Sequence, residues 1–190
     1  MKLQTKILKL PILIMLTIIS NKLIGQQEIN QNWNAFAQSF DMTSYQGGQF
    51  RFKGFVKVKD IALGSHAQLW ARIDVADGTG FFDNMYQRPI VSTEWKEYII
   101  EGLIAKNAIK LTLGGIGKGN GKYYFDNFTV EVKNEGRDWI KLPVANSGFE
   151  NQTFKSDWKS YNVKGFMLSL TSENVLEGNS SLFLNAEINK

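Results

Sequence analysis

The segment from His66 to Pro89 combines an alternating strand pattern with a loop rich in polar and aromatic side chains. In its first half every second residue from Ala67 to Val75 is apolar, so the residues between them share the opposite face of a strand. A strand needs only one apolar face to build a sheet, yet this second face carries a tryptophan beside an arginine. Aromatic rings suit the apolar faces of sugar rings, and polar side chains suit their hydroxyl rims. The pattern predicts a ligand-binding face made of Gln68, Trp70, Arg72 and Asp74.

A purely structural interpretation of the same face stays open. If a helix, a loop or a neighbouring module covers Trp70, the indole belongs to a core and binds no ligand. The strand pattern alone does not separate these two interpretations.

The loop that follows this strand, DGTGFFDNMYQRP, is a second candidate for ligand binding. Loops held by a rigid scaffold often carry binding residues. The candidate residues of this loop are Asp83, Asn84, Tyr86 and Arg88. In the structural alternative, the acid and the amide cap turns, Phe81 or Phe82 closes the end of the sandwich, and the arginine pairs with an acid.

The residue types needed for catalysis are scarce. His66 is the only histidine and cysteine is absent, so the sequence offers no thiol nucleophile and no histidine cluster. Glu97 and Glu101 share one strand face but lie among lysines, which indicates a solvated face rather than the acid–base pair of a glycosidase. The run GGIGKGNGK lacks the Ser or Thr of a phosphate-binding loop and is predicted to be a flexible hairpin turn. We therefore expect no catalytic activity in this chain.

Residues 1–25 have the layout of a secretory signal peptide, with four lysines, no acid, an apolar run and a polar stretch that ends at Gly25. The apolar run is shorter than the roughly 20 residues of a membrane-spanning helix. The whole chain has a formal net charge of +4, and without these four lysines the remainder is about neutral. We expect a secreted or periplasmic protein that, after signal cleavage, binds neither nucleic acid nor membrane.

Alternation with a period of two dominates the chain from residue 33 onward. The predicted strands are QFRFKGFVKVK, AQLWARIDV, EWKEYIIEGLI, AIKLTLGG and KYYFDNFTVEV, with NAFAQSF as a weaker candidate. Gly54, at the centre of the first, predicts a bulge or bend, and AIKLTLGG is expected to bury Ile109, Leu111 and Leu113. Short strands joined by glycine-rich turns predict an all-β protein with an antiparallel β-sandwich.

The polar joint KNEGRD suggests a boundary near residue 134, so that residues 26–134 form one β-sandwich module. Residues 135–190 are again β-rich, because FMLSLTS and SSLFLNAE alternate, but they are too few for an independent sandwich. We interpret this tail as the opening strands of an incomplete second module. The alternative is that these strands complete the first sandwich, and in either case no edge strand should stay unpaired.

The blocks GGQFRFKGFVKV, AQLWARID, FFDNMYQRPI, EWKEYIIEG and GKYYFDNFTVEV resemble successive parts of a jelly-roll, galactose-binding-like module of the carbohydrate-binding type. Such modules occur in secreted bacterial enzymes, beside tail-specific peptidases and erythromycin-esterase-like hydrolases. The resemblance covers residues 33–132. The tail, with NSGFE followed by EGNSSLFL, resembles the opening half of a similar jelly roll.

This resemblance implies a non-catalytic, carbohydrate-binding module that forms the N-terminal part of a larger secreted hydrolase. The implied partners are a carbohydrate and a covalently linked catalytic domain, a peptidase or an esterase. No organic cofactor is implied, but a structural Ca²⁺ held by Asp126 and Glu150 is, with a capped turn as the alternative. The alternative function is a structural module that packs between domains and has no ligand of its own.

Overall fold

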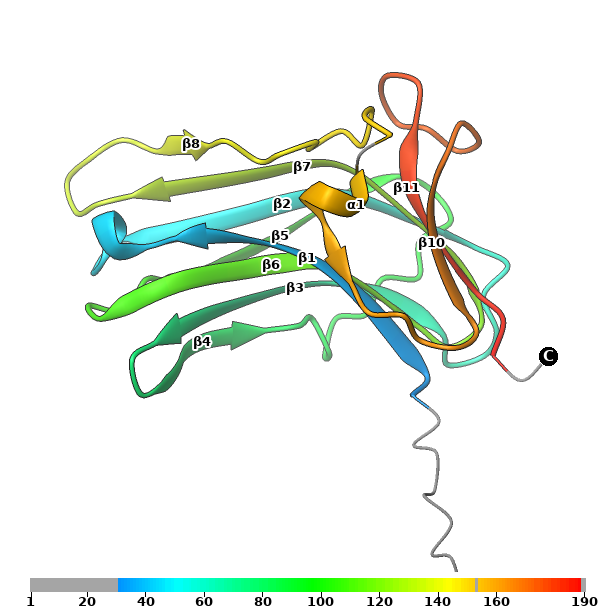
Figure 1. The fold of residues 1–190 in the computed structure, drawn as a ribbon, viewed down its shortest axis with the longest axis horizontal. Helices are drawn as coiled ribbons and strands as arrows, with labels where there is room; N and C mark the ends of the chain where they lie inside the picture. Colours follow the sequence, from blue (N-terminus) through cyan, green and yellow to red (C-terminus); the bar gives the residue numbers. More distant parts are fainter. Residues whose placement is uncertain (1–30, 153, 189–190) are drawn as a thin grey trace, which may run out of the picture. The chain divides into compact units, whose positions relative to one another are not determined.

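The computed structural model describes residues 31–152 and 154–188, which fold into two antiparallel β-sheets packed face to face (Figure 1). The predicted signal peptide lies outside the described residues. The elements in chain order are β1 (Trp33–Asp41), the 3-10 helix η1 (Thr43–Tyr45), β2 (Gln49–Lys59), β3 (His66–Val75), β4 (Gly78–Asp83), β5 (Lys96–Leu103), β6 (Ala108–Lys118), β7 (Gly121–Lys133), β8 (Ile140–Leu142), α1 (Phe154–Asp157), β9 (Lys159–Ser160), β10 (Phe166–Thr171) and β11 (Ser181–Ala186).

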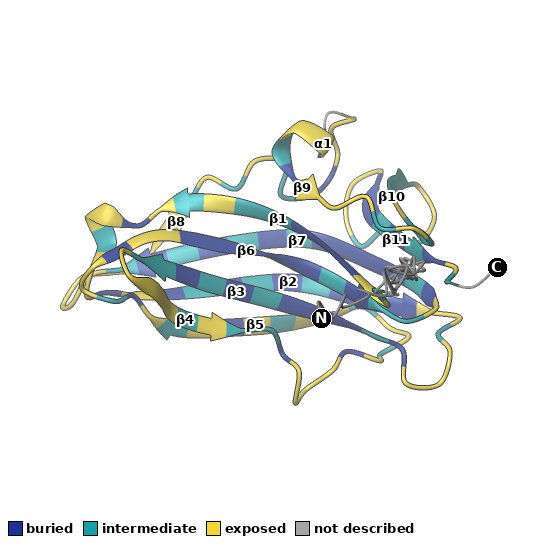
Figure 2. Cartoon of the chain, turned by 60° about the horizontal axis from the view of Figure 1, so that its bottom comes forward, coloured by how far each residue is buried: buried dark blue, intermediate teal, exposed yellow. Residues whose placement is uncertain are grey.

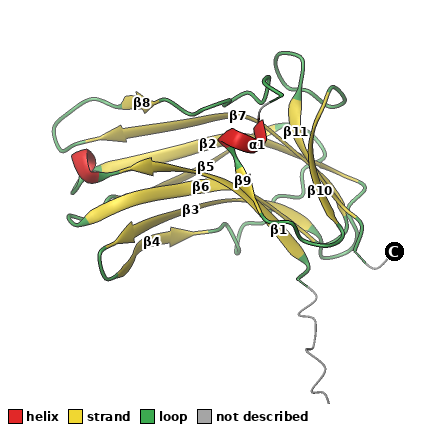
Figure 3. Ribbon diagram, in the orientation of Figure 1, coloured by secondary structure: helices red, strands yellow, loops and turns green. Residues whose placement is uncertain are grey.

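One sheet has five strands in the order β4-β3-β6-β1-β9, and the other has six, with β10-β11-β7-β2-β5 as its main path and β8 beside β7. The predicted all-β fold and antiparallel sandwich are confirmed. The two short helices lie at the periphery of the sheets (Figure 3), and no helix of the described residues is long and apolar enough to cross a membrane.

The alternating strands bury one face each, as their patterns predict. In β2 the inward residues Phe50, Phe52, Val56 and Val58 are fully buried, while the lysines and arginine between them remain partly accessible. Gly54 keeps this alternation and lies at a register shift between β2 and β7, where Asn127 and Phe128 of β7 both lie opposite it. A Cβ at Gly54 would lie 2.5 Å from the ring of Phe128, so only glycine lets this ring fill the centre of the core. The predicted bulge at Gly54 is therefore confirmed.

Two local predictions are wrong. Most of the run GGIGKGNGK is not a turn, because β6 continues to Lys118 and the chain reverses only at residues 119 and 120. Ile109 is exposed rather than buried. A register shift between β3 and β6 opposite Asp74 and Val75 changes the alternation at this end of β6 and turns Ala108 inward instead. The glycine-rich start of the loop after β3 forms a further strand, β4, which the sequence pattern did not indicate.

The tail beyond residue 134 supplies strands to both sheets. The edge strand β9 pairs with β1, and β11 pairs with β7 while β10 forms a hairpin with β11 (Figure 1). Trp158 is buried against the rings of Phe36, Phe128 and Phe149, at centroid distances of 5.6, 5.4 and 5.4 Å. This pairing is what the second alternative for residues 135–190 expects, and the division of the chain into two modules at residue 134 stays a prediction.

Candidate ligand-binding surface

The outward face of the five-stranded sheet is built from residues that lie opposite one another on β3, β6 and β1. Trp70 lies opposite Gly114, which in turn lies opposite Ala37. Because side chains directly opposite each other share one face of a sheet, the alternation of β3 places Gln68, Trp70, Arg72 and Asp74 together on this face, as predicted. From Leu69 to Ile73, β3 alternates between buried and partly buried residues (Figure 2).

The indole of Trp70 lies across the sheet rather than standing away from it. Its Nε1–H donates a hydrogen bond of 3.4 Å to the backbone carbonyl of Phe36 on β1, although β6 lies between β3 and β1. Gly114 makes this possible, because a Cβ there would lie only 1.9 Å from that same carbonyl oxygen. Trp70 is partly buried, and residues of α1 and of the segment after β9 line the same groove.

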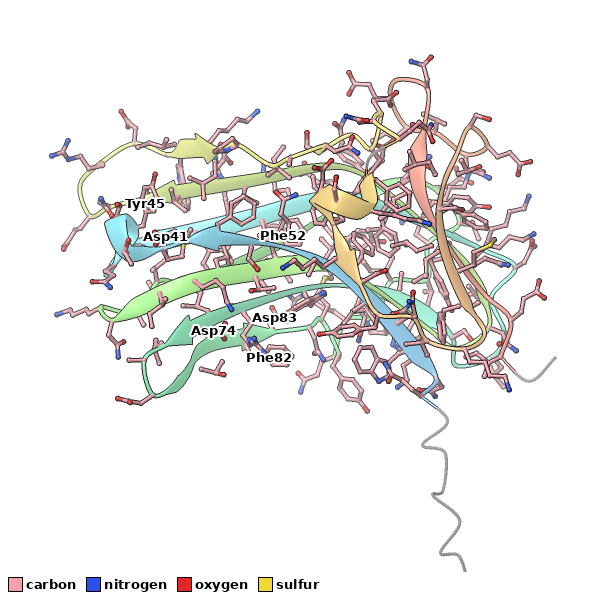
Figure 4. All side chains as sticks on the ribbon, in the orientation of Figure 1. Asp41, Tyr45, Phe52, Asp74, Phe82 and Asp83 are labelled. Atoms are coloured by element: carbon pink, nitrogen blue, oxygen red, sulfur yellow. The ribbon has the colours of Figure 1, made fainter. Side chains whose placement is uncertain are left out.

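Four further aromatic side chains surround Trp70, and together the five are called the aromatic platform below. They come from the start of β1, from β4, from the loop after β4 and from the segment after β9: Trp33, Trp70, Phe82, Tyr86 and Tyr161. Phe82, labelled on β4 in Figure 4, lies opposite Arg72 of β3. Phe82 is 57% exposed and Tyr161 is 68% exposed, so large apolar rings face solvent here.

A groove of about 560 Å³ runs over the aromatic platform. Its polar lining includes Gln68, Arg72, Asn84 and Lys118. Gln68 is only 3% exposed, and its side-chain Nε2 has no hydrogen-bond partner among the described residues. A buried amide N–H without a partner costs free energy, and this one lies beneath the surface of the groove.

A second and larger groove, of about 940 Å³, continues from the first toward the tail. Trp70, Arg72 and Tyr161 line both grooves, and the larger one adds side chains of α1, β9 and β10. The tail therefore forms one wall of this surface. This wall was not predicted, because the sequence left open whether residues 135–190 complete the first sandwich.

Asp74 is on the predicted face but does not line either groove. Its carboxylate pairs with Arg72 Nε at 2.7 Å and with Lys110 Nζ at 3.1 Å. Burial alone would raise the pKa of Asp74, but hydrogen bonds from Lys110 and Arg72 together hold it below its ordinary value. Asp74 therefore positions two cations.

The loop after β4 places only part of its predicted residues in the groove. Asn84 and Tyr86 line it, whereas Asp83 and Arg88 pair with each other at 2.5 Å. Asp83 also accepts a hydrogen bond of 2.7 Å from the backbone N–H of Met85, and Asn84 accepts one of 3.1 Å from that of Tyr86. These contacts are the turn caps of the structural alternative. A ligand-binding role for Asp83 and Arg88 stays a prediction.

Asp126 and Glu150, the implied calcium ligands, lie close enough to interact. The pKa of Asp126 is raised to about 6, chiefly by burial and also by the charge of Glu150, against hydrogen bonds from the backbone N–H groups of Leu176, Asn127 and Glu177 that lower it. Glu150 accepts hydrogen bonds from the backbone N–H groups of Asn179 and Ser180.

Calcium prefers six to eight oxygen ligands, whereas the groups that meet these two carboxylates are mainly N–H donors. Within the described residues no three acidic or histidine side chains gather as a metal cluster. The structural Ca²⁺ stays a prediction. The contacts of Asp126 and Glu150 are hydrogen bonds from backbone N–H groups.

Three residues of the aromatic platform were not predicted from the sequence. Trp33 begins β1, and the alternation of β1 places it on the same face of the sheet as Trp70. The weaker strand candidate NAFAQSF, which directly follows Trp33, was the only sequence signal for this strand. Phe81 or Phe82 was expected to close the end of the sandwich in the structural alternative; Phe81 packs against Phe50 at a centroid distance of 5.1 Å, and Phe82 is exposed. Tyr161 lies in the tail and carried no signal, because only the chain fold brings it to β3.

No protein-family model matches the sequence, and no curated protein is similar to it. Among the solved structures there is similarity to the N-terminal CBM22-1 and GH10 modules of the endo-1,4-beta-D-xylanase 10B of Clostridium thermocellum, complexed with xylohexaose. The identity is 14% and the TM-score is 0.39. The match covers 58% of this chain and 28% of the xylanase chain.

Proposed function

We propose that this chain is a non-catalytic module that binds carbohydrate on the outward face of its five-stranded sheet. The observation that carries this proposal is the aromatic platform, in which exposed rings line one groove together with a buried amide that has no partner among the residues the structure describes. Aromatic rings provide a large contact area at low cost in conformational entropy, and the polar side chains around them fix orientation.

Trp70 is the proposed anchor because it lines both grooves and a hydrogen bond holds its indole in place. The hydrogen bond to the Phe36 carbonyl fixes the indole across Gly114 before any ligand arrives. A ring held in place in this way loses little further freedom when a ligand binds, which favours affinity. Gln68 and Asn84 are proposed to bind hydroxyl groups beside it.

The setting of the module is also a proposal. The signal-peptide pattern of residues 1–25 supports export to the periplasm or the outside of the cell. The single histidine and the absence of cysteine support a binding rather than a catalytic role. In this proposal the catalytic activity belongs to a covalently linked hydrolase domain, which the module would hold near its polysaccharide substrate.

The test is affinity electrophoresis and calorimetry of the full chain against a panel of soluble polysaccharides. Trp70→Ala removes the anchor, and Trp139→Ala is the matched control. Trp139 precedes β8, beside the other sheet, where its ring packs against the charges of Arg51 and Lys133 at 4.3 and 4.8 Å.

We expect binding to at least one polysaccharide, a loss of tenfold or more in Trp70→Ala, and no change in Trp139→Ala. Absence of binding across the whole panel would overturn the proposal and favour the alternative, a surface that packs against another domain. Equal binding by Trp70→Ala and the unmodified chain would show that Trp70 does not anchor the ligand.

A further inference from the structure

We infer that the carbohydrate bound on this surface is anionic, carrying carboxylate or sulfate groups. This inference rests on the proposed function and narrows it to one chemical class of ligand. It comes from the charges that line the two grooves, which are strongly unbalanced in sign.

The groove over the aromatic platform is lined by two cations, Arg72 and Lys118, and by no acidic residue. The larger groove adds Lys110, Lys155 and Lys159 and contains a single acid, Asp157. Asp74 lies beside these cations and pairs with two of them. Five cations against two acids leave a net positive charge of three on a surface whose rings already suit a sugar. A neutral polysaccharide would gain nothing from this charge.

Lys118 and Lys159 carry charges that other side chains do not neutralise. Neither takes part in an ion pair between described residues, and the ammonium of Lys118 lies 5.6 Å from the ring centroid of Tyr86 in the groove. On the other sheet, by contrast, Arg51 pairs with Glu131 and Lys53 with Glu97. An anionic ligand would supply the missing partners for the groove lysines.

The polar groups of the smaller groove point to the same ligand. The free Nε2 of Gln68 is a donor, as are the guanidinium of Arg72 and the ammonium of Lys118. Carboxylate and sulfate oxygens accept hydrogen bonds without donating any, and they bind charged donors more strongly than hydroxyl groups do. The aromatic platform would hold the sugar rings while these donors hold the anionic substituents.

The first measurement compares polysaccharides that share a backbone and differ in charge. Dextran, carboxymethyl dextran and dextran sulfate form one set, and polygalacturonate and its methyl ester form another. We expect the full chain to bind the charged members at least tenfold more tightly at 50 mM NaCl. The affinity should fall as salt rises, because salt screens exposed charges. The carboxymethyl and sulfate arms show which anionic group is preferred.

The second measurement uses two variants with the same change in net charge. Lys118→Gln with Lys159→Gln removes charge from the grooves, and Lys59→Gln with Lys96→Gln removes it from exposed positions of the other sheet. We expect the groove variant to lose about fivefold in affinity for the charged polysaccharide and the control to keep it. Thermal unfolding of both variants confirms that each is folded.

Equal affinity for charged and neutral polysaccharides, with binding still dependent on Trp70, would overturn this inference and leave the proposed function standing. Equal losses in the groove and control variants would also overturn it, because attraction to the overall charge would then explain the binding. If no polysaccharide binds, both proposals fail together.

Discussion

The indole Nε1–H of Trp70 reaches across β6 to the backbone carbonyl of Phe36, 3.4 Å away, and Gly114 lies between the two strands that they belong to. The contact joins β3 to β1 without any side chain from β6. The indole of Trp70 is therefore fixed in the groove by the backbone geometry of β1 and β6. A substitution at Gly114 should therefore act on both stability and ligand binding.

Gly114→Ala is expected to destabilise the fold and to displace the ring of Trp70. The new Cβ would lie 1.9 Å from the Phe36 oxygen, a backbone atom that moves only if β1 moves. Overpacking of this kind typically costs about 1–3 kcal/mol, and a backbone clash belongs at the upper end of that range. Urea unfolding measures the loss of free energy, and the near-ultraviolet circular dichroism of the variant reports the displaced indole.

Gly148→Ala is the matched control for that substitution. A Cβ at Gly148 would meet its nearest neighbours, Glu150 and Asn127, at 3.9 and 4.0 Å, which is ordinary van der Waals contact. Its stability should stay within about 0.5 kcal/mol of the unmodified chain. Equal stabilities for the two alanine variants would mean that Gly114 is not needed for the approach of β1 to β6.

Strand identity was readable from the sequence, but strand neighbours were not. The period of two in QFRFKGFVKVK and AQLWARIDV predicted β2 and β3 and the side on which Trp70 lies, because alternation is a local property. The position of Gly114 under Trp70 depends on the register between β3 and β6, which no local pattern encodes. The same reason explains why Tyr161 of the tail was not predicted to lie on this surface.

Removal of the tail is expected to unfold the sandwich. A chain that ends at Asn134 would lose the strands that pair with β1 and β7, together with the buried side chains of Phe149 and Trp158. The exposed edges and the open core should leave it aggregated or unfolded, as measured by circular dichroism and gel filtration. A truncated chain that stays monomeric and unfolds cooperatively would show that residues 31–134 are sufficient for the fold.

Trp158→Ala tests the same dependence with a single change. Trp158 is 1% exposed and packs against Phe36, Phe128 and Phe149, so its removal leaves a large cavity. The expected loss is about 3–5 kcal/mol in urea unfolding. Trp139→Ala, which removes a partly accessible ring, should cost about 1 kcal/mol or less. Similar losses of unfolding free energy in Trp158→Ala and Trp139→Ala would argue against a core that the tail shares with the rest of the sandwich.

Asp126 is expected to make the protein less stable as the pH rises. Burial raises its pKa to about 6 in the folded chain, above the ordinary value of 3.8, so the folded state binds the proton more tightly than the unfolded state. The stabilisation is complete below the ordinary value and is lost as the pH rises through about 6. Between pH 5 and 7.5 the loss from this group is about 1 kcal/mol. Asp126→Asn should flatten this part of the urea-unfolding profile, and an unchanged slope would exclude Asp126 as its cause.

The same pair of proteins tests the predicted calcium site. If a Ca²⁺ lies between Asp126 and Glu150, millimolar calcium at pH 7.5 will raise the melting temperature of the unmodified chain and leave Asp126→Asn unchanged. The N–H groups that meet these carboxylates lead us to expect no such rise. Magnesium is the control, because it demands a smaller octahedral site.

Asp74→Asn is expected to strengthen the binding of an anionic polysaccharide. Its carboxylate pairs with Arg72 and Lys110, so its neutralisation leaves both cations free for a ligand. The ion pairs are partly exposed, and their loss should cost at most about 1 kcal/mol of stability. We expect the affinity for the charged polysaccharide to rise severalfold at 50 mM NaCl and the gain to shrink at 500 mM, as calorimetry would show. A variant that binds more weakly would instead mean that Asp74 is needed to hold Arg72 in position, and that the guanidinium acts through its orientation rather than its charge.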